Sequence, residues 1–187
     1  MEKRSQSKVG MAYGAMYGLA ASIVSLIFYF AGVDMQSKLP QYTGWVLLII
    51  FIVVGIKSYR DTELSGFISY GKSLGTGTVI GLFGGFITGI FTVLLFTIID
   101  PGLTAKIIEK IQEQWAEKGM TEEQISVALM WTKRMMSPVM LFIWSIVGSA
   151  FMSFLFSLII SIFMRKEGNP FQTNTQPMDS TTMNPQP

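Results

Sequence analysis

The stretch Ser73–Ile99, SLGTGTVIGLFGGFITGIFTVLLFTII, carries no charged residue and places Gly77, Gly81, Gly85 and Gly89 four positions apart. A helix needs about 20 residues to cross the hydrocarbon core of a bilayer, and this stretch has 27. Because four residues make slightly more than one helical turn, the glycines fall along one side of such a helix. The stretch therefore predicts a membrane-spanning helix with one narrow face.

Three further stretches are uncharged: Gly10–Val33, Thr43–Ile56 and Ser137–Met164. Together the four stretches hold 93 of the 187 residues, and all 26 charged residues lie in the other 94. The second stretch is short, and it reaches about 18 residues when it is extended to Pro40; a re-entrant or interfacial helix is the alternative there. We predict an all-α fold, an integral membrane four-helix bundle in a single domain (1–166), with spans over about 10–33, 40–57, 73–99 and 137–164.

Lysine and arginine are unevenly distributed over the segments between these spans. The loop after the first span holds only Lys38, whereas the cytoplasmic segments of membrane proteins carry an excess of bases. The bases elsewhere precede the first span or follow the second and fourth: Lys3, Arg4, Lys8, Lys57, Arg60, Lys72, Arg165 and Lys166. We therefore expect both termini in the cytoplasm. The first apolar run is longer than the roughly 7–15 residues of a signal-peptide core, so we expect it to remain as an uncleaved span.

The segment 101–136 is predicted to form an amphipathic helical hairpin on the outer side. Asp100 is a candidate N-cap, Gly119 a helix end, and Thr121 with Gln124 a capping box for the second helix. Two interpretations stay open. The apolar sides pack on each other and on the membrane surface, or the hairpin is a docking surface for a partner, with Trp115 and Trp131 as candidate anchors.

The remaining segment, residues 167–187, is rich in Asn, Gln, Thr and Pro and poor in apolar residues. A chain of this composition buries too little apolar surface to fold. We expect a disordered cytoplasmic tail.

Small residues recur every four positions in three of the four predicted spans. In a bilayer, helices associate by close packing, and small residues permit it. The candidate packing residues are Gly10, Gly14, Gly18, Gly77, Gly81, Gly85, Gly89, Ser145, Ser149, Ser153 and Ser157. Packing within one chain is favoured. Contact between identical chains and a conduction path remain alternatives.

The composition excludes several chemistries. The chain has no His and no Cys, so it lacks imidazole and thiolate metal ligands, thiol nucleophiles and disulfides. No span carries a charge or a central Pro of the kind that marks ion-coupled transporters. We expect no cofactor, no metal, no nucleic-acid partner and no enzymatic activity.

The densest cluster of functional groups lies in the loop after the second span. Lys57, Tyr59, Arg60, Asp61 and Lys72 are candidate contacts for anionic lipid headgroups or for a partner. Catalysis by Asp61 with Glu63 is disfavoured because an exposed turn lacks the desolvation that tunes catalytic pKa values.

The same loop carries a family resemblance. Its Tyr59-Arg60-Asp61, the following Gly66-Phe67-Ile68-Ser69-Tyr70-Gly71-Lys72, and later Asp100-Pro101 and Ser137-Pro138 resemble the bacterial membrane family catalogued as domain of unknown function 4199. The likeness covers approximately Lys8 to Lys166. It implies a four-span, multi-pass protein of the Gram-negative inner membrane and assigns no reaction.

These observations favour a non-enzymatic scaffold or accessory subunit of a membrane complex. Its partners would be the lipid bilayer and either another membrane protein or further copies of the chain. The alternative is an oligomeric channel or permease component for a small neutral solute, suggested by the serine stripe of the fourth span.

Overall fold

The computed structural model describes residues 5–34 and 37–166, so the tail predicted to be disordered lies outside the described residues. Over these residues the chain is helical and contains no β-strand, which confirms the all-α prediction; one isolated bridge pairs Ile68 with Lys166. The elements are α1 (Gln6–Phe30), α2 (Lys38–Ser58), η1 (Tyr59–Glu63), α3 (Tyr70–Leu94), η2 (Leu95–Ile99), α4 (Leu103–Glu117), α5 (Glu122–Met135) and α6 (Pro138–Met164).

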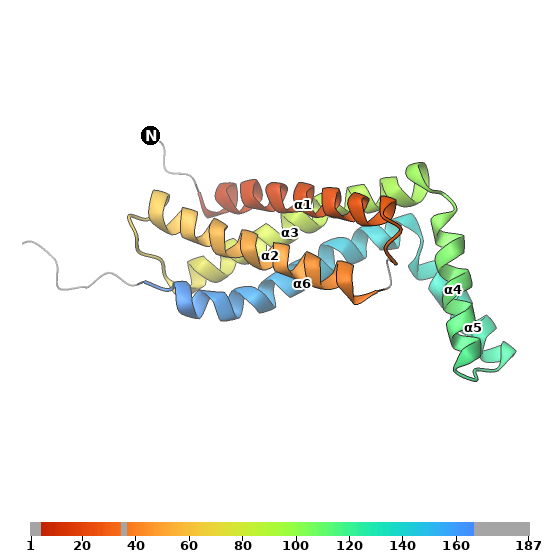
Figure 1. Ribbon diagram of the computed structural model, residues 1–187. Helices are drawn as coiled ribbons and strands as arrows, with labels where there is room; N and C mark the ends of the chain where they lie inside the picture. The colour runs from red at the N-terminus through yellow and green to blue at the C-terminus, as the bar shows by residue number, and fades with distance from the viewer. Residues whose placement is uncertain (1–4, 35–36, 167–187) are drawn as a thin grey trace, which may run out of the picture.

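Four of these helices are long and apolar enough to cross a membrane. They are α1, α2 with η1, α3 with η2, and α6, and they lie side by side in alternating directions (Figure 1). The shorter α4 and α5 form a hairpin that projects sideways from one end of the bundle (Figure 1). A bundle that crosses a membrane would thus hold this hairpin in the plane of the membrane surface.

The second long helix extends beyond its predicted limits. It begins at Lys38 and continues through a π-helical turn to Glu63, and it runs alongside the other long helices rather than turning back (Figure 1). Basic residues near its end do not interrupt helical backbone. The helix ends where Ser65 (φ 54°) and Gly66 (φ 87°) adopt left-handed conformations.

Helix α3 lies at the centre of the bundle and packs against α6 through its glycines. A Cβ atom at Gly77 or Gly81 would overlap the side chain of Ser157 or Ser153, respectively, and a Cβ at Gly85 would lie 2.7 Å from the Ser145 carbonyl oxygen. At this separation, serine hydroxyls reach across the seam. Ser153 donates to the Gly77 carbonyl (2.7 Å), and Ser149 donates to that of Gly81 (2.8 Å). The α3–α6 seam therefore combines close packing with interhelical hydrogen bonds.

A second face of α3 receives the glycines of α1. A Cβ at Gly14 would lie 2.7 Å from the Ile80 carbonyl oxygen, and one at Gly18 would lie 2.9 Å from that of Gly84. A Cβ at Gly10 would instead lie 2.7 Å from the Val79 side chain. Because backbone carbonyls and side chains of α3 lie this close, the α1–α3 seam has no room for larger side chains. In the described structure, then, α3 is clamped between α1 and α6.

The distribution of polar and apolar side chains is inverted relative to a soluble bundle. Ser153, Ser157 and Ser161 are fully buried, whereas Phe163 and Phe30 are 82% and 76% exposed. Small polar groups on the inside and large apolar groups on the outside suit a bundle that is solvated by hydrocarbon.

The hairpin caps agree with the sequence at one helix and differ at the other. Thr121 and Gln124 form the predicted capping box of α5, and Gly119 ends the preceding segment with φ 78°. The N-cap predicted at Asp100 is wrong, because α4 begins only at Leu103 and Gly102 precedes it. The Asp100 carboxylate accepts instead from Tyr29, Lys106 and the Gly102 N–H.

We predict that Gly81→Ala lowers the free energy of unfolding by about 1–3 kcal/mol, the usual cost of overpacking. The added methyl group would overlap the Ser153 side chain and press on the Ser149 carbonyl. The measurement is helicity by circular dichroism during denaturation in mixed micelles. Gly71→Ala is the matched control: its Cβ would meet nothing within 4 Å, so equal losses in both variants would contradict the seam.

Candidate functional site

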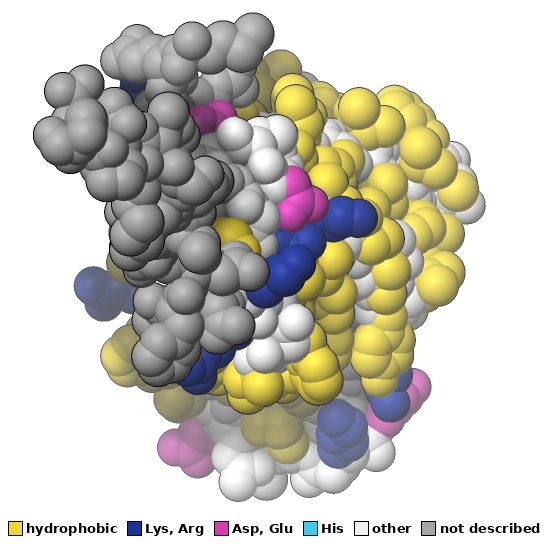
Figure 2. All heavy atoms as spheres, turned by 90° about the vertical axis from the view of Figure 1, so that its left-hand side faces the viewer, with side chains coloured by type: hydrophobic (Ala, Val, Ile, Leu, Met, Phe, Trp, Pro, Cys, Tyr) yellow, Lys and Arg dark blue, Asp and Glu magenta, His cyan; other side chains and the backbone are white. Residues whose placement is uncertain are grey.

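One candidate site is the end of the bundle where the described chain begins and ends. Figure 2 looks onto this end and shows basic side chains beside the hydrophobic flanks of the bundle. Lys57, Asp61 and Lys72 are exposed there. The Arg60 guanidinium pairs with the Asp61 carboxylate at 2.7 Å. Exposed bases at the end of a membrane bundle suit contact with anionic headgroups.

Several local contacts hold this end together. The backbones of Ile68 and Lys166 exchange two hydrogen bonds, which join the α2–α3 loop to the end of α6. The Lys166 ammonium lies over the Phe67 ring at 5.9 Å, and the Gln6 amide donates to the Lys72 carbonyl. Tyr59, proposed above as a contact residue, is only 6% exposed and packs in the core. The buried Tyr59 therefore positions the loop rather than offering a surface.

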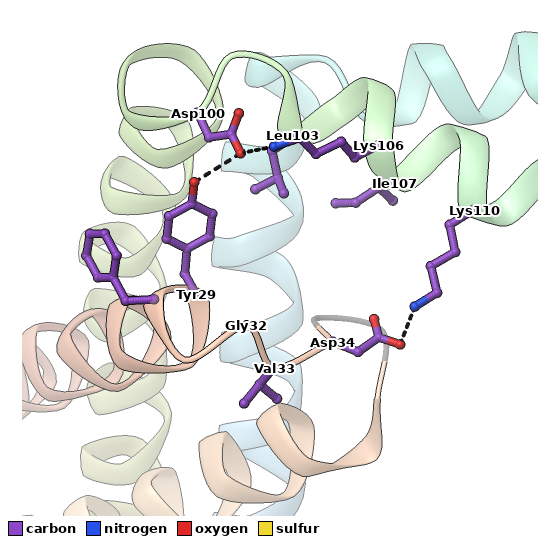
Figure 3. Close-up of a pocket in the computed structure, with 10 residues that line it drawn as sticks. Tyr29, Gly32, Val33, Asp34, Asp100, Leu103, Lys106, Ile107 and Lys110 are labelled. Carbon is purple, nitrogen blue, oxygen red and sulfur yellow. Dashed lines mark hydrogen bonds and ion pairs between the residues drawn. The ribbon is translucent and has the colours of Figure 1, made fainter.

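The second candidate site is the junction between the bundle and the hairpin at the opposite end (Figure 3). A pocket lies between the end of α1, the α1–α2 loop and the first half of α4. The Asp100 carboxylate accepts from the Tyr29 hydroxyl (3.0 Å) and from Lys106 Nζ (2.9 Å), and Lys110 Nζ pairs with Asp34 at 2.5 Å. We call these two ion pairs the hairpin latch, because they join α4 to the bundle.

The hairpin latch shifts the pKa values of the Asp100–Lys106 pair. The hydrogen bond from Lys106 is the largest influence on Asp100 and, with that from Tyr29, holds the pKa of this carboxyl below its usual 3.8. The same hydrogen bond raises the pKa of Lys106 above its usual 10.5. A lowered carboxyl pKa contributes stability above pH 3.8 that is lost as the pH falls through the lowered value. A raised ammonium pKa contributes stability below pH 10.5 that is lost on the alkaline side.

The hairpin latch was not among the sites predicted from the sequence, although the sequence carries a signal for it. Asp34 and Asp100 each follow an uncharged span that ends on the same side, and Lys106 and Lys110 lie one turn apart on the next helix. The signal is an acid at the end of each of two spans, together with two bases spaced four residues apart on an amphipathic helix. The pairing itself needs the three-dimensional approach of α4 to the α1–α2 loop.

The hairpin presents its two tryptophans differently. Trp115 is half-buried, whereas Trp131 is 58% exposed. Val127, Met130 and Met135 are also exposed and recur at helical spacing with Trp131. We call these four side chains the outer face of α5. Within α5, Ile125 is the one residue that is buried.

Over residues 5–34 and 37–166, no group of three His, Cys, Asp or Glu side chains is placed to hold a metal ion. The features described so far are the charged ends of the bundle, the apolar outer face of α5, and the small-residue seams between four helices that are able to span a bilayer. These features define a helical integral membrane protein.

The family model described as Protein of unknown function (DUF4199) matches residues 12–166, and the chain belongs to that family. This finding confirms the resemblance drawn from the loop and turn motifs. No curated protein and no solved structure matches the chain.

We predict that Asp100→Asn loosens the hairpin at neutral pH, because the neutral amide no longer attracts Lys106. Spin labels on Lys38→Cys and Ala116→Cys report the distance from α2 to α4 by electron paramagnetic resonance, and the chain has no native Cys to interfere. The distance distribution should be broader in Asp100→Asn than in the labelled protein that keeps Asp100. In the latter protein it should broaden only as the pH falls below 3.8. Glu117→Gln, on an exposed position of α4, is the control; an unchanged distribution in Asp100→Asn would refute the latch.

Proposed function

We propose that this protein is a non-enzymatic scaffold or accessory subunit of a complex in the inner membrane of a Gram-negative bacterium. The outer face of α5 carries the proposal: an apolar surface on a latched arm that extends sideways from the bundle (Figure 1). Exposed apolar patches rimmed by polar groups mark interaction sites. Here Lys133 and Arg134 supply the polar rim.

The hairpin is held in one conformation, which favours specific binding of a partner over a simple attachment. The latch fixes α4 at two points, and the capping box fixes the start of α5. A surface that is already ordered loses less conformational entropy when a partner binds. Trp131 is the candidate anchor, since tryptophan is enriched among the residues that dominate binding energy.

In the proposed orientation both termini are cytoplasmic and the hairpin faces outward. The distribution of charge supports it. Lys8, Lys57, Lys72 and Lys166 lie at the end of the bundle away from the hairpin. An excess of Lys and Arg near the ends of spans favours the cytoplasmic side.

The contacts of the serine stripe favour this role over a channel. In the seam, Ser149 and Ser153 donate to glycine carbonyls of α3, so the protons of those hydroxyls hold helices together and are not offered to a solute along a conduction path. Likewise, the ion pair of Asp61 with Arg60 favours a structural role over acid–base catalysis for that carboxylate.

We predict that Trp131→Glu abolishes co-purification of a membrane partner while the helicity stays unchanged. Loss of an exposed tryptophan anchor costs a complex about 2 kcal/mol or more, whereas folding does not depend on a side chain that is 58% exposed. The measurement is quantitative recovery from native membranes in mild detergent. Ala116→Glu, which adds the same charge on an exposed position of α4, should leave recovery intact. Equal recovery with Trp131→Glu would rule out α5 as the partner surface.

We further predict opposite locations for the hairpin and the carboxyl end. An alkaline phosphatase fusion after Gly119 should be active, because that enzyme needs the oxidising exterior, and a fluorescent reporter after Pro187 should be active from the cytoplasm. Activity of the same reporter type at both sites would contradict the orientation.

A further inference from the structure

Two glycines of the long helices break the packing rule that the others follow. Beyond the first helical turns, the glycines of α1 and α3 and Gly55 of α2 lie close to neighbouring atoms, whereas Gly44 of α2 and Gly148 of α6 do not. A Cβ at either of these two would meet nothing within 4 Å. Glycine costs a helix about 1 kcal/mol relative to alanine, and no contact within the described chain accounts for that cost here.

Gly44 and Gly148 line one cavity of about 400 Å³ between α2 and α6. This volume lies within the usual range for small-molecule sites, roughly 300–1,000 Å³. The indole rings of Trp45 and Trp144 also line it. Trp45 is held at an angle to the rings of Tyr42 (5.7 Å) and Phe156 (6.4 Å), so this wall is fixed. Trp144 is 53% exposed on the outer surface of the bundle, so the cavity opens where lipid would lie.

The hydroxyl groups that line the cavity offer a specific hydrogen-bonding pattern. Ser145 donates its proton to the Leu141 carbonyl (2.9 Å), and Ser149 donates its own to Gly81 (2.8 Å). Both serine oxygens therefore have only lone pairs left for a ligand, so they favour one that brings its own hydrogen-bond donor. The exposed Gln41 also lines the cavity, and its amide can both donate and accept.

We propose that this cavity binds a neutral, flat-ringed lipid that carries a hydroxyl group. No charged side chain lines the cavity, which favours a neutral ligand. Trp45 and Trp144 with the two bare glycines suit a flat ring, and the two serine acceptor oxygens suit a hydroxyl donor. Ser145 lies seven residues from the start of α6, about 10 Å along the helix, so the hydroxyl would sit below the outer end of the bundle. This site does not rest on the proposed scaffold role.

Energy transfer to dehydroergosterol, a fluorescent flat-ringed alcohol, tests the site directly. The protein carries Trp115→Phe and Trp131→Phe, which leaves Trp45 and Trp144 beside the cavity as donors, and is reconstituted in phosphatidylcholine vesicles. Transfer should saturate as the probe fraction rises, and non-fluorescent ergosterol should reverse it. The acetate ester of the probe, which has no donor proton, should bind about tenfold more weakly, equivalent to 1.4 kcal/mol.

Substitutions locate the binding. Gly148→Leu and, from the opposite wall, Gly44→Leu should each fill the cavity and weaken transfer about tenfold. Val147→Leu adds bulk at the adjacent position, which is 52% exposed and does not line the cavity, and should leave transfer unchanged. If one glycine variant fails to fold, the other variant and the competition with ergosterol still decide the matter.

Three results would overturn the proposal. Transfer that rises linearly with the probe and resists ergosterol would indicate simple partition into the bilayer. Equal binding of the ester would remove the role of the two serine oxygens. A protein that is dimeric in vesicles and becomes monomeric in Gly148→Leu would show that a second copy of the chain occupies the cavity.

Discussion

The close approach of three backbones along α3 is the constraint on which the rest of the structure depends. Helices in hydrocarbon gain no hydrophobic free energy from meeting each other, so contact distance and hydrogen bonds must hold them together. Glycines on two faces of α3 bring α1 and α6 within reach, and the Ser149 and Ser153 hydroxyls then bond to α3 carbonyls. With α1, α3 and α6 fixed, the ends of the spans are fixed too. Asp34 and Asp100 can then meet the bases of α4.

The sequence predicted the features that depend on local chemistry. Uncharged runs located the four long helices, and Thr121 with Gln124 located the start of α5. Prediction from the sequence failed where groups far apart in the chain compete to bind one side chain. Asp100 is a good N-cap by type, but Tyr29 from α1 and Lys106 from α4 hold its carboxylate. The π-helical turn that follows α2 was not predicted; left-handed backbone at Ser65 and Gly66 stops the helical segment and charge does not.

The seams and the cavity follow from the same residue type in different surroundings. Sequence spacing marks Gly81 as a packing residue and is silent on Gly44 and Gly148, because neither belongs to a regular repeat within its own helix. Only the structure distinguishes a glycine pressed against a backbone from one that faces open space. The distinction is informative because glycine lowers the stability of a helix in either case. Only at a closely packed position does a contact within the same chain account for that cost.

The two seams also determine which part of the bundle can yield. Helix α2 lies outside the clamp formed by α1, α3 and α6: it approaches closely at Gly55 and otherwise packs through larger side chains such as Leu48, Ile52 and Ile56. A small movement of α2 away from α6 would widen the cavity at Gly44 and leave the hydrogen bonds of Ser149 and Ser153 to α3 intact. Entry of a ligand between α2 and α6 would therefore leave the seams and the latch undisturbed. The helix that is packed least tightly is thus the one beside the cavity, as a site reached from the lipid requires.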